Sequence, residues 1–506
     1  MDGTKLLILG GLALVVAVSL RKALHDNKLA TAIPVVGSSG FFSSYWDGYK
    51  YLAHATELIQ AGYDQYPNGI FRVAQLFHWD YIVCGNKLVG ELGNAPESVL
   101  SFSEGVEELT MGRAIATNAY HIHAIRTSLT RNLHRCFPDV RDEIVCAFDD
   151  ILQLQGSEWK AVTVLPTSMA IVARVSNRLF LGLPLCRDKA YLQNNIKFTL
   201  DVFQSARRIN LWPPSMRPFV APFISSKDRS FDAALKFLGP LLEERLAKEN
   251  ELGPDWPGKP NDLISWLLEI AEGDERTAPA LTLRLLSTNM AAIHTSSMAF
   301  TNALLDLAAH PEFLLPMREE VERVLREEGW TKAALNSMAK IDSFFRESQR
   351  LNGTGPVGMM RRVIAKEGFQ FSNGAVVPYG AFVAVASRPA HYDSANYDNP
   401  AVFDGFRFSR EREAQKMDVD STKEGDLQPF KRHMISTAVD HLPFGNGKHA
   451  CPGRFFAATE LKAMLAHTVM NYDIKAEVEG VRPPNKVYGS VITPNATGKV
   501  LFRKRQ

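Results

Sequence analysis

The chain has 506 residues, of which 46% are hydrophobic and 22% are charged, and its formal net charge is +2. This composition is typical of globular proteins and excludes collagen-like and disordered chains. A nearly neutral chain also argues against nucleic-acid binding, because phosphate recognition usually needs a concentrated basic surface.

The N-terminal segment predicts a membrane anchor. Residues 6–20 are uncharged and almost wholly apolar, and as a helix they span about 22 Å at 1.5 Å per residue. A cleaved signal peptide is the alternative, but Arg21 and Lys22 stand where a small-residue cleavage site should be. The positive-inside rule then leaves the rest of the chain in the cytosol. We therefore expect a single transmembrane helix over residues 1–24.

After this anchor, residues 25–45 form a short connector in which Pro34 ends any helix. The chain length alone would allow about two to four domains. Residues 46–506, however, contain no long linker rich in Pro, Gly or Ser. We therefore expect them to form one large domain.

The first half of that domain should be mainly helical. Residues 62–90 alternate apolar stretches with turn residues and predict a small β region, whereas residues 95–310 have mainly helical periodicity. Residues 211–224 are apolar, aromatic and Pro-rich, so we expect a non-helical loop that dips into the membrane or gates a substrate. Residues 281–310 lack Pro and Gly and end before Pro311, which predicts one central helix of about 45 Å.

The last third of the chain adds a second β region and another helix. Residues 357–385 have strand-like patterns around Asn373-Gly374, a dipeptide that favours a hairpin turn. The charged residues 411–431 predict a loop, and residues 452–471 predict a helix. The predicted fold class is mainly α with minor antiparallel β.

The five cysteines are few and widely spaced, and no two form a CxxC pair. They indicate neither a disulfide framework nor a zinc site, and they favour a reducing compartment. We interpret four of them as small buried hydrophobes, which free cysteines usually are: Cys84, Cys136, Cys146 and Cys186.

The fifth, Cys451, lies in the segment FGNGKHACPGR, which covers residues 444–454. Glycines let backbone N–H groups approach the sulfur. The positive end of the helix that begins at Pro452 should lower the pKa of the thiol. Phe444 could shield the sulfur. The pattern fixes four positions within ten residues, so a chance match would be rare.

This segment resembles the cysteine signature of cytochromes P450, especially membrane-bound fungal ones, and the resemblance covers nearly the whole chain. It implies the cytochrome P450 fold, with residues 46–506 as a haem-thiolate catalytic domain. It also implies haem b as the cofactor, its iron held by the thiolate of Cys451. Four neighbouring residues would then contact the haem: Phe444, Gly447, His449 and Gly453.

Glu347-Ser348-Gln349-Arg350 is similar to the Glu-x-x-Arg helix of this family. Residues 320–323 match the same pattern, but Glu347 has the position that the family order requires, 104 residues before Cys451. Arg407, in the segment FDGFRF, would complete a buried network of Glu347, Arg350 and Arg407. A network of this kind would fix the architecture around the cysteine loop.

Residues 291–296 (AAIHTS) are similar to the oxygen-binding segment of the family's central helix. The resemblance implies that Ala292 leaves room for dioxygen and that Thr295 holds the hydroxyl and water chain that delivers protons. His294 stands where the family usually has an acid. It either relays protons near neutral pH or is an ordinary core histidine.

The resemblance also supplies candidates for binding the haem propionates: Arg126, Arg361, His391 and His449. Ile122 replaces the tryptophan that the family usually has four residues before Arg126, which removes one expected hydrogen bond. Either Arg361 or the adjacent Arg362 could serve, and the position of the strand after Glu-x-x-Arg favours Arg361.

The activity that the resemblance implies is that of a monooxygenase that uses O2 as co-substrate. The chain has no dinucleotide-binding fingerprint. NADPH must therefore bind elsewhere. The resemblance implies NADPH-cytochrome P450 reductase as the partner, docking near a group of basic residues on the cysteine side: Lys431, Arg432, Lys448 and Arg454.

The expected substrate is a lipophilic small molecule, because the regions that should line the pocket are mostly apolar: Ile115, Phe203, Trp212, Ile293, Met359 and Met360. Similarity to fungal members that act on terpenoids points to a terpenoid of secondary metabolism. The anchor points to the endoplasmic reticulum membrane, with the catalytic domain in the cytosol.

Three other hypotheses stay open at this stage. One is a member of the family that rearranges or dehydrates its substrate without a reductase. Another is a haem-binding sensor or sequestering protein. The third is a membrane-anchored structural protein whose cysteine loop is accidental. The absorption spectrum of the reduced, carbon-monoxide-bound protein separates the third from the rest.

Overall fold

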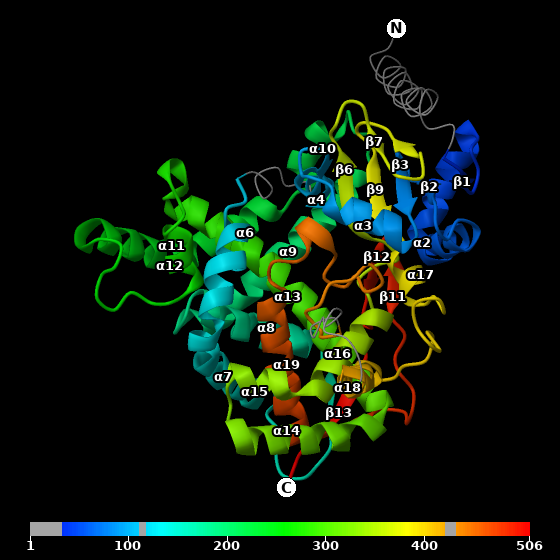
Figure 1. Cartoon of the computed structure of the whole chain (residues 1–506). Coiled ribbons are helices and arrows are strands. Elements are labelled where there is room, and N and C mark those ends of the chain that lie inside the picture. Colours follow the sequence, from blue (N-terminus) through cyan, green and yellow to red (C-terminus); the bar gives the residue numbers. More distant parts are fainter. Residues whose placement is uncertain (1–32, 111–117, 420–431) are drawn as a thin grey trace.

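The structure is a computed structural model that describes residues 33–110, 118–419 and 432–506. A β-rich part lies beside a larger helical part (Figure 1). Helices form most of the described chain, and the strands pair mainly antiparallel. The predicted fold class is therefore confirmed. The structure adds two parallel pairings, β1 with β2 and β3 with β9.

The β-rich part contains a six-stranded sheet in the order β1-β2-β3-β9-β6-β4. Its strands are β1 (Val35–Val36), β2 (Ile70–Ala74), β3 (Trp79–Val83), β9 (Phe382–Val385), β6 (Gly358–Val363) and β4 (Leu100–Ser101). The hydrophobic residues of β2 and β3 are buried on both faces of the sheet. Helix α2 (Phe41–Gln65) covers one face and α3 (Asn86–Asn94) the other, each through its apolar side.

The helical part surrounds α13 (Ala278–Ala309), which lies in the middle of the molecule (Figure 1). The helices packed against α13 are α8 (Val164–Phe180), α9 (Lys189–Asn210), α11 (Lys227–Leu252), α16 (Ala339–Leu351) and α19 (Arg454–Asn471). The remaining α-helices of the described helical part are α4 (Phe102–Thr110), α6 (His121–Ala124), α7 (Thr130–Leu152), α10 (Arg217–Ile224), α12 (Leu263–Leu268), α14 (Leu314–Glu328), α15 (Lys332–Ser337), α17 (Ser387–His391) and α18 (Arg407–Val419).

Local sequence explains the length of α13. The Thr277 side chain caps its N-terminus by accepting a hydrogen bond from the Ala280 N–H, at 3.4 Å. Pro279 lies in the first turn, where its missing N–H costs nothing. The helix ends just before His310 and Pro311. The sequence therefore predicted this helix correctly, apart from its first turn.

Three small sheets complete the fold of the described residues. One contains β10 (Tyr472–Ala476), β13 (Lys499–Lys504) and β5 (Lys160–Thr163). The second is the hairpin of β11 (Lys486–Tyr488) and β12 (Val491–Thr493), and the third is that of β7 (Phe369–Gln370) and β8 (Val376–Val377). Asn373 and Gly374 lie between β7 and β8, and Gly374 has a φ of +85°. The predicted hairpin turn is thus confirmed.

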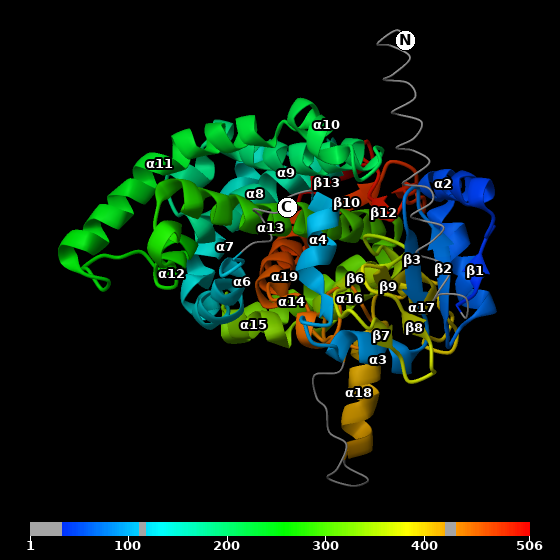
Figure 2. The ribbon, with the colours of Figure 1, turned by 90° about the horizontal axis from the view of Figure 1, so that it is seen from above.

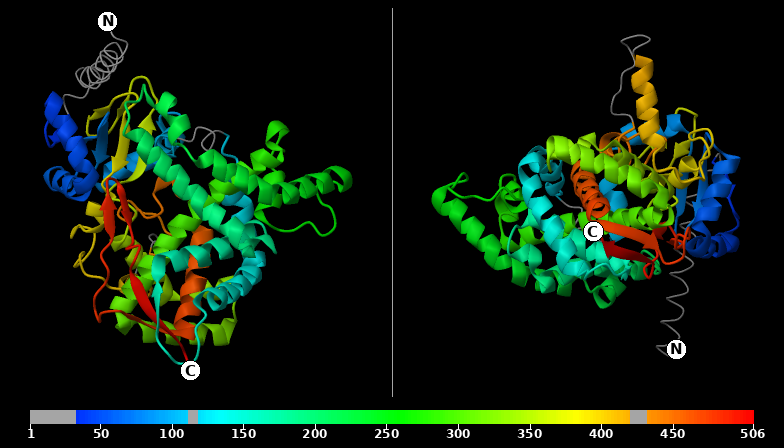
Figure 3. Two further views of the ribbon diagram at one scale, coloured as in Figure 1. Left: turned by 180° about the vertical axis from the view of Figure 1, so that it is seen from behind. Right: turned by 90° about the horizontal axis from the view of Figure 1, so that it is seen from below.

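The structure corrects two expectations about loops. Residues 217–224 form α10 despite Pro218 and Pro222, because Pro218 lies in the first turn. Residues 407–419 form α18, because Arg, Glu, Ala, Gln, Lys and Met are all strong helix formers. Helix α18 extends away from the body of the molecule (Figures 2 and 3). Residues 420–431 of the predicted loop lie outside the described part of the chain.

Within the described ranges, no helix is long and apolar enough to cross a membrane. The predicted transmembrane helix, residues 1–24, lies outside those ranges.

Candidate functional site

The loop that carries Cys451 is closed by its own backbone. The Cys451 N–H donates to the Phe444 carbonyl at 2.8 Å, and the Gly445 N–H donates to the Leu442 carbonyl at 2.9 Å. Gly447 has a φ of +73°, and a Cβ there would lie 2.1 Å from the Gly93 carbonyl oxygen. Only glycine fits this close approach of the loop to α3. Steric exclusion of any side chain therefore explains why residue 447 is a glycine.

Cys451 is half-buried just before α19. Burial raises the pKa of its thiol, while the backbone N–H groups of Gly453 and Arg454 and the Arg454 guanidinium oppose that rise. These groups form the positive environment that we expected around the sulfur. Burial has the larger effect, however, so the pKa of the Cys451 thiol in the protein alone is raised and not lowered as predicted. A thiolate in this position needs a cation at the sulfur, and thiolates are ligands of iron. The loop thus fits a bound haem iron.

The other cysteines differ from Cys451. Cys84, Cys136 and Cys186 are buried, and burial raises the pKa of each thiol, to about 12, 11 and 11 respectively. Their thiols therefore stay protonated and pack as small hydrophobes. Cys146, half-buried on α7, is the one most similar to Cys451 in exposure.

Positive residues gather beside the cysteine loop. His449 stacks on Phe102, with 6.2 Å between ring centroids, and the Arg361 guanidinium lies 5.1 Å from the same ring. Burial lowers the pKa of His449, and the charges of Arg361 and Arg126 lower it further. The charges of Arg361 and Arg126 thus reach His449, and the charge of Glu97 opposes them. Such a cluster suits a buried anion.

Unpaired atoms point to the same conclusion. Arg361 is only 2% exposed, and its Nε atom and His449 Nε2 have no hydrogen-bond partner among the described residues. His449 Nε2 is 3.4 Å from a Glu97 oxygen, which satisfies the distance of an ion pair but not the geometry of a hydrogen bond. Arg362 instead pairs with Glu104 at 3.2 Å. Of the two adjacent arginines, Arg361 is the one that fits a carboxylate such as a propionate.

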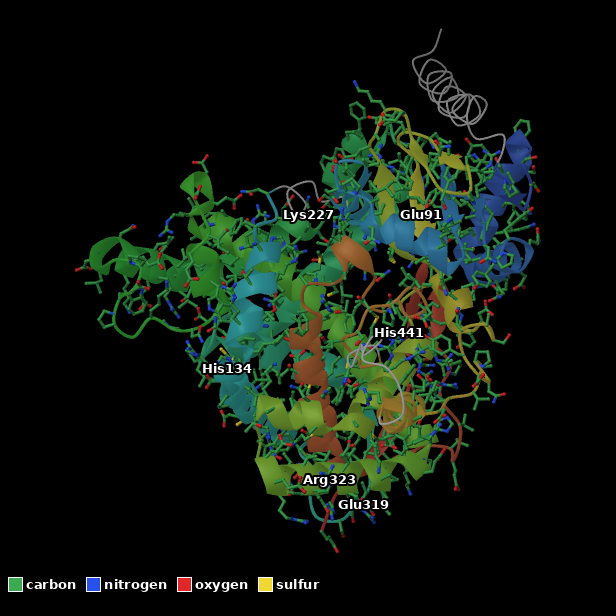
Figure 4. All side chains as sticks on the ribbon, viewed as in Figure 1. Glu91, His134, Lys227, Glu319, Arg323 and His441 are labelled. Carbon is green, nitrogen blue, oxygen red and sulfur yellow. The ribbon has the colours of Figure 1, made fainter. Side chains whose placement is uncertain are left out.

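His391 does not belong to this cluster. Its Nε2 accepts a hydrogen bond from the Leu442 N–H at 3.0 Å, and its backbone carbonyl accepts one from Arg350 at 2.6 Å. Its ring lies 5.7 Å from that of His441, which Figure 4 marks in the middle of the molecule. Burial lowers the pKa of His391 to about 3. The structure therefore corrects the prediction of His391 as a propionate ligand and places it beside the Glu347 network.

That network has the predicted members. Arg350 forms a two-pronged pair with Glu347, with N–O distances of 2.8 and 2.7 Å, and the Arg407 Nε lies 3.3 Å from the same carboxylate. Arg350 and Glu347 are completely buried. Both arginines also donate to backbone carbonyls of residues 391–402. Every polar atom removed from water thus has a partner, as a buried ionic network requires.

The second Glu-x-x-Arg match has another role. Glu320 accepts hydrogen bonds from the backbone N–H groups of Lys340 and Ile341, at the start of α16. Arg323 pairs with Glu327 at 3.1 Å, and Figure 4 shows Arg323 on α14 at the edge of the molecule. Residues 320–323 therefore contain no internal Glu–Arg pair like that of Glu347 and Arg350.

The central helix leaves one stripe open. Ala291 and Thr295 are exposed although most of α13 is buried, and Ala292 is half-buried. The Thr295 hydroxyl donates to the Ala291 carbonyl at 2.7 Å. Ala291 and Thr295 lie one turn apart on the same face of the helix, and their exposure leaves room beside that face for a bound group. Thr295 is thus placed where a hydroxyl can contact a ligand.

His294 is directed elsewhere. Burial lowers the pKa of His294, and a hydrogen bond to the backbone of Ile196 in α9 opposes this. Its Nε2 has no hydrogen-bond partner within the described chain. The ring therefore bonds to α9. The contact with α9 suits a core histidine and the unpaired Nε2 suits a proton relay, so both sequence-based hypotheses stay predictions.

Sequence reasoning missed Glu460. This residue of α19 is completely buried, and it accepts a hydrogen bond from Ser176 at 2.7 Å and another from Ser296, the neighbour of Thr295. Burial raises the pKa of Glu460 to about 8. One oxygen, Oε2, has no partner within the described ranges. No local signal marks Glu460, because Thr459 and Lys462 make this stretch look like an ordinary polar part of the helix.

It also missed the ionic contacts of Asp342. This buried aspartate of α16 accepts from Lys462 of α19 at 3.1 Å, from Arg412 of α18 at 2.6 Å and from the Met434 N–H at 3.0 Å. One helix turn away, Arg346 donates to the carbonyls of His433 and Ser436. Together these bonds hold the chain that leads to the cysteine loop. Nothing in the local pattern around Asp342 reveals partners this distant.

The residues predicted to line the pocket differ in their exposure. Phe203 and Trp212 are exposed, and Met359 and Met360 are half-buried. Ile293 is completely buried in the core, so it cannot line an open pocket as predicted. Ile115 lies outside the described residues.

The basic residues predicted for a docking surface also differ. Lys448 is exposed, whereas Arg454 is half-buried and donates to the Cys451 carbonyl at 2.8 Å. Arg432 pairs with Glu411 at 3.0 Å and with Asp440 at 3.6 Å. Lys431 lies outside the described residues. Of the four, Lys448 has the exposure that a docking surface needs.

Comparisons with known proteins agree with this geometry. The family model for cytochrome P450 matches residues 54–502. "Cytochrome P450 monooxygenase 103" from Postia placenta is 40% identical over 481 residues, which cover 94% of this chain and 93% of that protein. "Cytochrome P450 monooxygenase CYP512U6" from Ganoderma lucidum is 34% identical over 512 residues, which cover 100% of this chain and 97% of that protein.

A solved structure gives the same result for the fold. The chain is similar to the crystal structure of the cytochrome P450DA heme domain, with a TM-score of 0.68 and 18% sequence identity. The similarity covers 95% of this chain and 99% of that one.

Proposed function

Because the chain belongs to the cytochrome P450 family, and its relatives are named monooxygenases, we propose that it oxidises a lipophilic small molecule with O2 and electrons from NADPH. The reaction class is insertion of one oxygen atom into the substrate, while the other leaves as water. NADPH-cytochrome P450 reductase is the proposed electron donor. The observation that carries the proposal is the half-buried Cys451 in a glycine loop, beside unpaired atoms of Arg361 and His449.

The residues present fit haem b. Cys451 supplies the thiolate for iron, and Arg361, His449 and Arg126 supply positive charge for the propionates. Phe444 is half-buried next to the loop and can pack on the porphyrin, while Gly447 and Gly453 let the loop approach it. When bound, haem supplies the binding and reductive activation of O2.

The protein's share is to position the substrate and to hold protons. The Thr295 hydroxyl, exposed on the open stripe of α13, would donate a proton or hold a water. The Glu347–Arg350–Arg407 network and the contacts of Asp342 fix the backbone around Cys451. These buried charges keep the ligand loop in one geometry.

Membrane attachment is part of the proposal. Residues 1–24 would anchor the chain in the endoplasmic reticulum membrane with residues 46–506 in the cytosol. Helix α10 supports a further membrane contact, because Phe219 and Phe223 are 74% and 91% exposed. A lipophilic substrate that partitions into the membrane would reach the enzyme from that side. Because the named relatives come from fungi, a terpenoid of fungal secondary metabolism is the proposed substrate class.

The first test is the absorption spectrum of the reduced, carbon-monoxide-bound protein. The unchanged protein should show the band shift of thiolate-bound haem, Cys451→Ala should lose it, and Cys146→Ala should keep it. Cys146 is the matched control because both cysteines are half-buried. A Cys451→Ala variant that keeps the band would refute the ligand assignment.

The second test concerns activity. Membranes that contain the protein and a reductase are incubated with NADPH and a panel of terpenoids, and the products are analysed by mass spectrometry. Products that carry one additional oxygen support the proposal. Conversion that needs no NADPH would instead identify a rearranging or dehydrating enzyme, and haem binding with no conversion of any lipophilic compound would favour a haem-binding protein.

A further inference from the structure

The C-terminal hairpin β11–β12 is fixed at both ends to the body of the protein. At its turn, the Gly489 N–H donates to the Leu52 carbonyl of α2 at 2.8 Å, and Ser490 bonds to Tyr51 at 3.0 Å. Before the hairpin, Arg482 pairs with Asp306 of α13 and donates to Asn302 at 2.8 Å. The hairpin therefore cannot move far without breaking these bonds. Figure 3 shows it between the sheet and the helical part.

Although Gly489 in its turn is buried, the first strand of this hairpin is exposed along its whole length. Tyr488 and Val491 are paired across the two strands, so their side chains lie on the same face. They are 37% and 51% exposed. The hairpin is anchored to the core, yet it leaves these two apolar side chains exposed, and Tyr488 meets helix α9.

Helix α9 presents a matching stripe. Leu200 and Phe203 are 42% and 48% exposed, and Arg207 is exposed one turn further along the same helix face. The Arg207 guanidinium carbon lies 3.2 Å from the centre of the Tyr488 ring. The two exposed apolar surfaces are thus bridged by one cation–π contact. Helix α9 leads directly into residues 211–216 and α10, the segment with the exposed phenylalanines.

We infer that Arg207 and Tyr488 form a latch that controls how a lipophilic substrate enters between α9 and the C-terminal hairpin. The inference rests on the proposed function. The hairpin is the fixed side of the latch, and α9 with the chain up to α10 is the side that must move. Leu200, Phe203 and Val491 give the opening an apolar lining, which suits the substrate class proposed above.

The energy of the contact sets the expected effect. An exposed cation–π contact changes an equilibrium by about two- to fivefold. Loss of the latch should therefore raise the entry rate of a bulky ligand by about the same factor, and it should leave a small ligand unaffected. A role limited to stability would change neither rate.

The test uses the haem-loaded protein and two imidazoles that bind haem iron and shift its absorption. Clotrimazole is the bulky lipophilic probe and 1-phenylimidazole the small one, and stopped-flow absorption gives both association rate constants. Arg207→Met and Tyr488→Leu should each speed clotrimazole about two- to fivefold, and the double variant should not be faster than either. Arg208→Met, at the adjacent exposed arginine, and Tyr488→Phe, which keeps the ring, are the matched controls.

The outcomes separate this inference from the proposed function. If the unchanged protein shows no absorption shift with either imidazole, the proposed function fails. If every variant shows the shift with equal clotrimazole rates, the latch is wrong while the proposed function stands. Equal acceleration by Arg208→Met, or an additive double variant, would also overturn the latch.

Discussion

Replacing Glu460 by glutamine should change how the stability of the protein depends on pH. Burial raises the pKa of this carboxyl group from 4.5 to about 8. Between these pH values the folded protein keeps a proton that the unfolded chain has lost, so the free energy of unfolding falls as pH rises. At about 1.4 kcal/mol per pH unit, the loss from this one group is about 4 kcal/mol between pH 5 and pH 8.

Glutamine has nearly the same shape and binds no proton in this range. Glu460→Gln should therefore gain about 4 kcal/mol relative to the unchanged protein when the pH is raised from 5 to 8. The hydrogen bonds from Ser176 and Ser296 can be kept by the amide oxygen. The difference between the two proteins, and not either curve alone, isolates this residue.

The assay is urea denaturation of the haem-loaded protein, followed by circular dichroism at several pH values from 5 to 8. Glu328→Gln, on the exposed end of α14, is the control for removing one carboxylate. Its curve should stay parallel to that of the unchanged protein. If the Glu460→Gln curve is parallel as well, Glu460 is not protonated in the folded protein at neutral pH and the reasoning fails.

Three further predictions concern the site. Arg350→Met removes the main partner of the buried Glu347 and should cost about 3 to 5 kcal/mol of stability, measured as a loss of haem-loaded protein. Arg323→Met, at an exposed position on α14, should bind haem as the unchanged protein does, and equal haem loading of the two variants would contradict the prediction. Gly447→Ala places a Cβ 2.1 Å from the Gly93 carbonyl oxygen and should abolish the thiolate band of the carbon-monoxide spectrum. Gly374→Ala, with a φ of +85° but open space around it, should keep the band at a cost of about 1 kcal/mol, and retention of the band in Gly447→Ala would show that the loop can shift. Thr295→Val should reduce the product formed per NADPH consumed by at least about tenfold and release more hydrogen peroxide. Thr301→Val, in the buried part of α13, should leave this ratio unchanged. An unchanged ratio in Thr295→Val would show that this hydroxyl does not deliver protons.

Features that depend on neighbours in sequence could be predicted from the sequence. The glycine loop before Cys451, the uninterrupted run that became α13 and the turn at Asn373-Gly374 all follow from backbone preferences within a few residues. The same local reasoning failed at α10 and α18. There, residue types that looked unfavourable or merely charged were compatible with helices.

Features that depend on burial and on distant charges required the tertiary structure. The two Glu-x-x-Arg matches look alike in sequence, yet Glu347 pairs with arginines inside the protein while Glu320 caps the start of α16. His391 was expected at the propionates and instead contacts Leu442 and Arg350.

The sequence by itself determined the conformation of the loop around Cys451, because the conformation of a short loop depends on the residues within it. Only the tertiary structure decided how readily the buried groups ionise. Burial raises the pKa of the Cys451 thiol despite the helix end beside it, and burial raises the pKa of the Glu460 carboxyl group to about 8. The physical reason is that desolvation depends on every segment packed around a group, and those segments come from all parts of the chain.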